Sequence, residues 1–283
     1  MKDYSIYIDT DSIYVGIEQW IKDNTSMHKW NNLDKSQKID YINRISKVIE
    51  EEVNVRSFNE VQKIHYNSQD TDFKINFEQE KIIQAGLFST KKRYALWTLL
   101  DGSKPKNDVS VTGLEVIRSD SPEIVKPMVK KILKMILNDD TDSHIRKYIR
   151  ECKKKLNNCL PSDIAENKGI NNITKYVTKD NVCKKGTPHQ VKGVAAYRKL
   201  IDLLKIQGKY EDIQNGNKGK VVYLMKNKFN FNSLTFITWC KEFDKVIRVD
   251  FQKMIQNNFT KKVEKLLLLV NRQHLLYSNT NLF

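Results

Sequence analysis

The segment Ile6–Val15 constrains this chain more than any other part of it. It reads Ile-Tyr-Ile-Asp-Thr-Asp-Ser-Ile-Tyr-Val, with two apolar β-prone runs on either side of two aspartates that stand one residue apart. Because side chains alternate between the two faces of a strand, Asp9 and Asp11 can project the same way from a tight hairpin turn. Paired carboxylates supply the oxygen ligands that magnesium prefers. Aspartate is also a common turn residue, so the alternative is a hairpin with an inert acidic turn.

The net charge of +15 is unevenly distributed along the 283 residues. Residues 1–80 carry 10 Lys+Arg and 15 Asp+Glu, a net of −5, whereas residues 81–283 carry 39 and 19, a net of +20. A large basic segment favours a polyanionic partner such as nucleic acid, and the alternative is a basic surface that keeps the protein soluble. A hydrophobic content of 40% excludes a disordered chain and suffices for one large or two modest domains.

The cysteines show no metal or disulfide pattern. None of the four forms a C-x-x-C pair, and no histidine spacing completes a zinc site. The longest apolar run, Leu266–Val270, is too short to span a bilayer, and the first thirty residues do not resemble a signal peptide. We therefore expect a soluble, intracellular protein in a reducing compartment, with no membrane partner.

Hydrophobic periodicity predicts an α+β fold. A stripe of isoleucines and a valine at helical spacing predicts a helix over residues 34–53, and strands are predicted over 73–78, 93–100 and 109–117. From residue 121 the pattern is mainly helical, with helices predicted from 121 and over 142–156, 191–204 and 250–270. Short β runs at 220–225 and 235–239 complete this part. We place the domain boundary near residue 120.

A run of three cations precedes an aromatic residue in Ser89–Ala95, which reads Ser-Thr-Lys-Lys-Arg-Tyr-Ala. On a strand, alternation places Lys92 and Tyr94 on one face and Lys91 and Arg93 on the other. Long cations reach phosphates or minor-groove acceptors, and an aromatic ring packs on sugar. The alternative is a solvated charge run that leads into a strand.

These two motifs resemble those of family B DNA polymerases. Tyr-x-Asp-Thr-Asp-Ser is similar to motif C, and Lys-Lys-Arg-Tyr is similar to the segment that holds the primer–template minor groove. The resemblance continues in order along nearly the whole chain, to the C-terminal third of polymerases of the T-even-like phage type. It implies the C-terminal half of a palm with a partial antiparallel sheet over residues 1–120. A mainly helical thumb with a small β element then occupies residues 121–283.

The resemblance also implies roles for single residues of the palm. Glu80, with Glu78 as the second candidate, matches an acidic position close to the metal site. Residues 112–122 resemble the segment that ends the palm, although Thr112 stands where a lysine is common. We read Glu115 and Arg118 in that segment as a structural ion pair.

In the thumb, residues 187–198 resemble a segment in which a proline–histidine run precedes a basic residue, a glycine and a helix. Lys192 and Arg198 are then phosphate contacts, and a glycine before a helix lets backbone amides approach phosphate closely. His189 is read as a capping or core residue. The tail that ends in Leu282 and Phe283 resembles a peptide that docks in a sliding clamp, and a frayed terminus is the alternative.

Motif A, motif B and the exonuclease motifs are missing from these residues. Two-metal phosphoryl transfer needs a second aspartate, so the resemblance implies a split polymerase whose other chain carries the exonuclease, the fingers and motif A. Asp11 then binds Mg²⁺ together with the partner's aspartate, and Asp9 assists. The substrates are primer–template DNA and a deoxynucleoside triphosphate, and a phage protein would act in the host cytoplasm.

Three alternatives remain open. One is a non-catalytic basic module that binds DNA or tethers a clamp, and another is a vestigial polymerase fragment. The third is a phosphatase of the haloacid-dehalogenase type, with Asp9 as nucleophile and Asp11 as acid, which requires alternating βαβ units.

Overall fold

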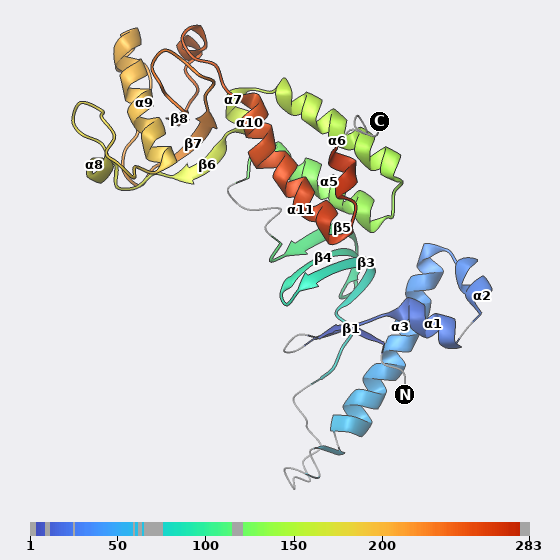
Figure 1. Ribbon diagram of the computed structural model, residues 1–283. Coiled ribbons are helices and arrows are strands. Elements are labelled where there is room, and N and C mark those ends of the chain that lie inside the picture. Colours follow the sequence, from blue (N-terminus) through green and yellow to red (C-terminus); the bar gives the residue numbers. More distant parts are fainter. Residues whose placement is uncertain are drawn as a thin grey trace. The chain divides into compact units, whose positions relative to one another are not determined.

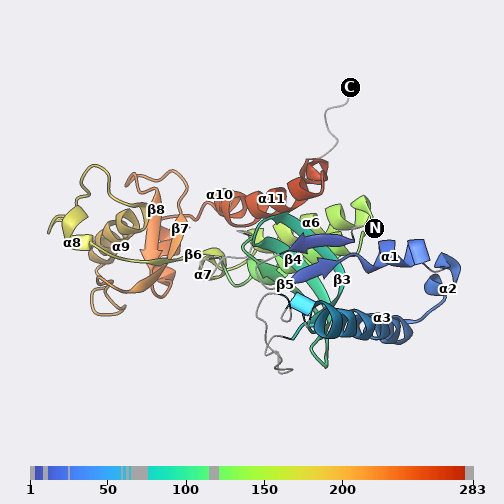
Figure 2. The same ribbon diagram turned by 90° about the horizontal axis from the view of Figure 1, so that it is seen from below.

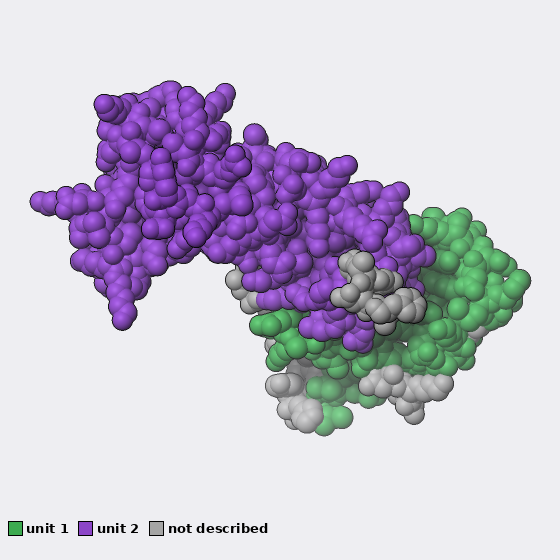
Figure 3. Space-filling model, turned by 45° about the horizontal axis from the view of Figure 1, so that its top comes forward, with its two compact units in different colours: residues 1–113 green, residues 114–283 purple. Residues whose placement is uncertain are grey.

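The computed structural model describes residues 4–8, 12–24, 26–58, 60–61, 64, 76–114 and 121–277. The chain forms two compact units, residues 1–113 and 114–283, which Figure 3 colours separately. In the described residues, helices accompany three small sheets whose strands all pair antiparallel, which confirms the predicted α+β class.

Unit 1 begins with the predicted hairpin. Strands β1 (Ser5–Ile8) and β2 (Ile13–Val15) pair antiparallel, with Tyr7 opposite Tyr14 and Ile8 opposite Ile13 (Figure 1). The short helices α1 (Ile17–Asn24) and α2 (Met27–Asn31), which the sequence analysis does not predict, follow directly.

Helix α3 (Lys35–Glu51) confirms the helix predicted over 34–53. Asp34 caps it, because its carboxylate accepts from the Gln37 amide while the Gln37 side chain accepts from the Asp34 amide. The helix continues into a π-helical segment, η1 (Glu52–Phe58).

The prediction of a strand over residues 73–78 is wrong for residues 76–78, the part of it that the structure describes, because these residues form no strand. The main chain of this segment bonds to side chains that follow one another along α3 and η1, not to a neighbouring strand. The Asn54 side chain both donates to and accepts from Phe77, and the Gln79 amide donates to Glu50 at 2.6 Å. These bonds satisfy the backbone without a sheet.

The second sheet has the order β3-β4-β5. Strand β4 (Arg93–Asp101) confirms the predicted strand, whereas β5 (Lys104–Thr112) begins earlier than predicted. Most of β3 (Lys81–Thr90) was not predicted, because apolar and polar residues do not alternate clearly in its sequence. Four consecutive residues of β4, Ala95 to Thr98, are buried and centre this sheet.

In unit 2, a helical layer contains α5 (Val125–Leu137), α6 (Asp142–Asn157), α10 (Phe251–Ile255), α11 (Lys261–Leu269) and the 3-10 segment η4 (Gln273–Leu276). Helix α6 packs on α5, α10 and η4, and α11 packs on α5 (Figure 2). The predicted helix over 250–270 is confirmed in extent, but a π-helical segment, η3 (Gln256–Thr260), joins α10 to α11. None of the helices in the described part of the chain is long and apolar enough to cross a membrane.

The rest of unit 2 is a small sheet with a helix on it. Strands β6 (Glu166–Gly169), β7 (Lys218–Tyr223) and β8 (Ser233–Phe236) pair in that order, and α9 (His189–Leu204) packs on β8. The short elements α7 (Pro161–Ile164), α8 (Ile173–Tyr176) and η2 (Lys241–Lys245) connect them. Both β runs and the helix predicted here are confirmed, and β6 was missed.

Candidate functional site

Four aromatic rings join the acidic hairpin to the strands that carry the basic motif. Tyr7 and Tyr14 form a cross-strand pair in one hairpin, and Phe88 and Tyr94 form a cross-strand pair between β3 and β4. All six centroid separations among these rings lie between 5.4 and 5.8 Å. Such pairs contribute about 0.5–1.5 kcal/mol each beyond burial of their area. The aromatic cluster therefore fixes the acidic hairpin against β3 and β4.

The hydroxyl of Tyr14 in this cluster is held in its neutral form. Burial raises the pKa of Tyr14, and a hydrogen bond with Tyr94 and the charge of Glu80 raise it further. The influence of Glu80 places its carboxylate within electrostatic reach of the acidic hairpin. A second bond joins the two motifs directly, because the Lys92 amide donates to the Tyr7 hydroxyl at 2.8 Å.

The structure corrects the placement of the cations. Lys91 and Lys92 form the two-residue turn between β3 and β4 instead of lying on a strand, so alternation does not assign them to faces. Lys92 has a φ of 59°, a left-handed conformation that is uncommon for residues with a side chain. Lys91, Lys92 and Arg93 are all exposed, whereas Tyr94 is half-buried in the aromatic cluster.

A glycine brings a third motif to this turn. Gly113, which follows Thr112 at the end of β5, has a φ of 64°, and a Cβ there would lie 2.0 Å from the Lys92 carbonyl oxygen. Only glycine permits both the conformation and the close approach. The Thr-Gly step therefore lies directly beside the Lys91–Lys92 turn, while Glu115 and Arg118 fall outside the described residues.

Glu80 lies just before β3, at the edge of this arrangement. The Glu80 carboxylate forms an ion pair with Lys81, and the Glu80 side chain is 70% exposed. The main-chain carbonyl of Glu80 accepts a hydrogen bond from the main-chain amide of Gly102 at 2.7 Å. The pKa of Lys81 is raised, first by its hydrogen bond to Glu80. Glu78 is exposed two residues earlier.

The two predicted catalytic residues, Asp9 and Asp11, lie outside the described residues, between the paired Ile8 and Ile13. Among the described residues, no group of three or more His, Cys, Asp or Glu side chains is placed to hold a metal ion. The predicted clamp-binding residues Leu282 and Phe283 are also outside the described part. These assignments therefore remain predictions.

The two cations predicted to contact phosphate, Lys192 and Arg198, differ in what surrounds them. Lys192 is exposed in the first turn of α9. Arg198 is held by Asp212, at 3.1 and 3.2 Å, and donates to the Ile213 carbonyl at 2.7 Å, so its guanidinium already has a structural partner. Gly193 was predicted to precede a helix and to let the backbone approach phosphate, and this prediction is wrong. Gly193 lies within α9, and the absence of a side chain there allows α9 to pack closely on Thr235.

Sequence reasoning missed Tyr7, Tyr14 and Phe88 as residues that position the site. Tyr7 and Tyr14 flank the acidic turn at positions that face the same way in a hairpin, so the pattern alone contained that signal. Phe88 lies on the strand that was not predicted, and nothing local to it marks its role.

We predict that Phe88→Ala loosens the acidic hairpin. The substitution removes three ring pairs, so amide hydrogen exchange of β1 and β2 should accelerate about tenfold or more. Phe229→Ala, which removes a ring stacked on Phe231 in unit 2, is the matched control and should leave hairpin exchange unchanged. Unchanged exchange in Phe88→Ala would show that the aromatic cluster does not hold the hairpin.

A comparison with protein-family models identifies the family of this chain. The family model described as DNA polymerase family B matches residues 36–268, more than half of the chain. No curated protein matches the chain significantly. The phosphatase alternative loses its basis, because the described sheets are antiparallel and contain no βαβ unit. This family-model match over residues 36–268 shows that the chain belongs to DNA polymerase family B.

Proposed function

We propose that this chain supplies the motif C half of a nucleotidyl-transfer site and a basic grip on primer–template DNA. Asp9 and Asp11 are the catalytic pair, and the deoxynucleoside triphosphate is the second substrate. The observation that carries the proposal is the fixed relation between the acidic hairpin and the Lys91–Lys92 turn, through the aromatic cluster and the Lys92–Tyr7 bond.

The donor chemistry of the hairpin suits magnesium. Asp11 and Asp9 supply carboxylates in the segment between the paired Ile8 and Ile13, and the charge of Glu80 acts on Tyr14 of the same hairpin. Glu80 is paired with Lys81, so a metal ion would share this carboxylate with the Lys81 ammonium group or compete with it. Magnesium held by these carboxylates would supply activation of the primer 3′-hydroxyl and neutralisation of the leaving pyrophosphate. The chain's own contribution is to aim these carboxylates and to hold the primer end near them.

The grip on DNA comes from exposed cations on a constrained turn. Lys91, Lys92 and Arg93 are exposed, and the left-handed Lys92 backbone is held by Tyr7 and by the close approach of Gly113. Side chains on a fixed turn lose less entropy when they bind phosphate or a minor-groove acceptor. Tyr94 acts mainly through the aromatic cluster that joins this turn to the acidic hairpin.

The rest of the site comes from polypeptide outside these residues, and we propose that a second chain supplies it. The acidic hairpin offers a place for it: Ile6, Ile8, Ile13 and Val15, on the side away from the tyrosines, are 59, 60, 49 and 42% exposed. A two-stranded hairpin is marginal by itself, and an apolar face of this kind normally packs against further structure. Because Ile8 and Ile13 of this face flank the segment that contains Asp9 and Asp11, a second-chain segment that covers the face can bring an aspartate to the metal ions.

Reconstitution tests the proposal. The chain is mixed with a companion polypeptide that carries motifs A and B, and primer extension is measured with Mg²⁺. We expect extension only when both chains are present. Absence of extension with every such companion, in Mg²⁺ or Mn²⁺, would overturn the assignment in favour of a vestigial fragment or a DNA-tethering module.

Substitution of the apolar hairpin face tests the docking of the second chain. Ile6→Ser with Ile13→Ser should abolish association with the companion, while changing the stability of the free chain by only about 0.5 kcal/mol because both side chains are exposed. Val182→Ser with Leu203→Ser, residues of unit 2 that are 52 and 54% exposed, is the matched control. Equal loss of association in both double variants would contradict docking at the hairpin.

A further inference from the structure

The first turn of α9 is fastened to the small sheet at three points. The main-chain carbonyl of His189 accepts from the Ser233 hydroxyl at 3.2 Å, and that of Gln190 accepts from the Thr235 hydroxyl at 2.7 Å. Ser233 and Thr235 belong to β8 and are buried. The third point is the His189 ring, whose centroid lies 4.4 Å from that of Tyr223, the last residue of β7. A titratable side chain thus takes part in holding the start of α9.

The packed His189 ring has no acceptor for a second proton. Its Nε2 atom is buried and has no hydrogen-bond partner among the described residues. A neutral imidazole carries a proton on only one of its nitrogens, whereas the charged ring is a donor at both. Charging this ring would leave a buried donor unpaired within a charged group, which is costly. The ring therefore packs stably only in its neutral form.

The place of His189 in the helix acts in the same direction. His189 is the first residue of α9, a helix of 16 residues, and follows the N-cap Pro188. The amide groups of a first helical turn have no partners within the helix and give that end a partial positive charge. An imidazolium at this position is repelled by the helix dipole, so the formation of α9 itself disfavours protonation of the ring.

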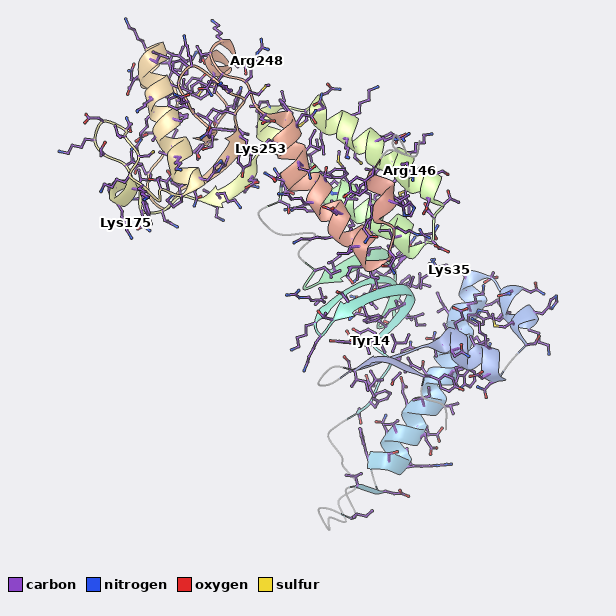
Figure 4. All side chains as sticks on the ribbon, viewed as in Figure 1. Tyr14, Lys35, Arg146, Lys175, Arg248 and Lys253 are labelled. Atoms are coloured by element: carbon purple, nitrogen blue, oxygen red, sulfur yellow. The ribbon has the colours of Figure 1, made fainter. Side chains whose placement is uncertain are left out.

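Two lysines face this ring from α10 and from α9. The Nζ atom of Lys253, on α10, lies 4.4 Å from the centroid of the Tyr223 ring, against which His189 packs. Figure 4 labels Lys253 on α10, close to the small sheet. Lys192 lies three residues after His189 on α9, so the two side chains share one side of the first turn. Both ammonium groups disfavour a further positive charge between them.

Strand β6 brings one group of each sign to the same face of the sheet. The register pairs Lys168 with Gly219 and Glu166 with Val221. Because side chains alternate along a strand, both lie on the face that carries Tyr223, two residues beyond Val221. Lys168 and Glu166 form an ion pair at 3.4 Å, so the carboxylate is already engaged with a cation of its own strand.

The titration of His189 reflects these surroundings. Burial lowers the pKa of His189 first. Three lysine charges lower it further, those of Lys253, Lys192 and Lys168. The Glu166 charge acts instead on Tyr223, whose pKa is raised by burial and then by that carboxylate.

We propose that His189 is a pH-sensitive latch, whose neutral ring holds the first turn of α9 on the small sheet and whose protonation releases that turn. In the released or unfolded chain, the ring takes up a proton with the ordinary pKa of histidine, 6.5, whereas the packed ring does so only at lower pH. The stability of the latched state is therefore fully present above pH 6.5 and is lost as the pH falls below it. The released turn contains Lys192, so the position of this cation would also depend on pH.

Urea denaturation of the whole chain at pH 7.5 and pH 5.5 tests the latch, followed by the indole NMR signal of Trp239 in unit 2. On acidification, the equilibrium constant for unfolding should rise about tenfold more in the wild-type chain than in His189→Phe. Phenylalanine keeps a ring against Tyr223 but cannot take up a proton, and His189→Gln gives the same comparison if the larger ring does not fold. His28→Phe, which removes an exposed histidine from α2 in unit 1, is the matched control and should keep the wild-type pH dependence. Equal pH dependence in the wild-type chain and in the non-titrating variant would overturn the latch.

Amide hydrogen exchange locates the effect. The Val191 and Lys192 amides donate to the Pro188 carbonyl at 3.0 and 2.9 Å and report the first turn, whereas the Leu200 amide reports a later turn of α9. After correction for the intrinsic effect of pH on exchange, protection of the first turn should fall about tenfold more than that of Leu200 between pH 7.5 and pH 5.5. This difference should vanish in His189→Phe. A fall that is uniform along α9 would overturn the latch, because acid would then loosen the small sheet as a whole.

Discussion

Replacement of Asp11 by Asn should abolish nucleotide addition while leaving DNA binding intact. Asn keeps the size and shape of the side chain but removes the negative charge that, in the proposed site, would hold a divalent cation. Metal ions contribute several kcal/mol to the transition state of phosphoryl transfer, so loss of one ligand should lower the rate by at least about 10³-fold. The measurement is primer extension by the reconstituted polymerase, with duplex binding by the chain alone measured in parallel.

Two further variants make this result specific. Asp9→Asn should lower the rate less than Asp11→Asn, because Asp9 assists and Asp11 is the principal ligand in the proposed site. Asp180→Asn, which removes an exposed carboxylate from a turn in unit 2, should leave both rate and binding unchanged. Unchanged synthesis in Asp11→Asn would restore the reading of an inert acidic turn on a DNA-binding module.

The elements predicted well from the sequence are those whose signal is local. The helix at 34–53 combines an apolar stripe with a capping box at Asp34, and both are visible in the sequence. The hairpin at Ile6–Val15 likewise carries its turn and its alternation within ten residues. In each case a single segment contains the whole physical cause of its structure.

The features that escaped prediction depend on contacts between distant segments. The segment around residues 73–78 looks like a strand, but the main chain of Phe77 and Gln79 bonds to the side chains of Asn54 and Glu50, a choice of partner that no local pattern reveals. The turn at Lys91–Lys92 depends on Tyr7, which lies 85 residues from Lys92 in the chain, and on Gly113 at the end of β5. The candidate site was therefore recognised by its motifs, whereas the cluster that positions it became visible only in three dimensions.

Gly193 is a single residue whose role follows from a contact with a distant segment and not from its neighbours in the sequence. From the sequence, a glycine beside a lysine at a helix start predicts a phosphate approach, whereas in the fold it faces the backbone of β8. A Cβ at Gly193 would lie 2.2 Å from the Thr235 Oγ1 and 2.6 Å from the Thr235 amide nitrogen. The Thr235 hydroxyl cannot simply turn away without loss, because it donates to the Gln190 carbonyl at 2.7 Å.

Gly193→Ala should therefore destabilise unit 2 although alanine favours a helix. Overpacking costs about 1–3 kcal/mol, and the upper end applies here because the added Cβ meets backbone that cannot move. This cost exceeds the gain of about 1 kcal/mol that alanine brings in helix propensity. We expect a net loss of about 2 kcal/mol and a fall in Tm of roughly 4–8 °C, measured by thermal unfolding. Gly169→Ala is the matched control, because its Cβ would meet nothing closer than 3.9 Å. If Gly193→Ala is as stable as Gly169→Ala, α9 does not pack on β8 as closely as described, and the backbone at Gly193 would be free to approach phosphate as the sequence predicts.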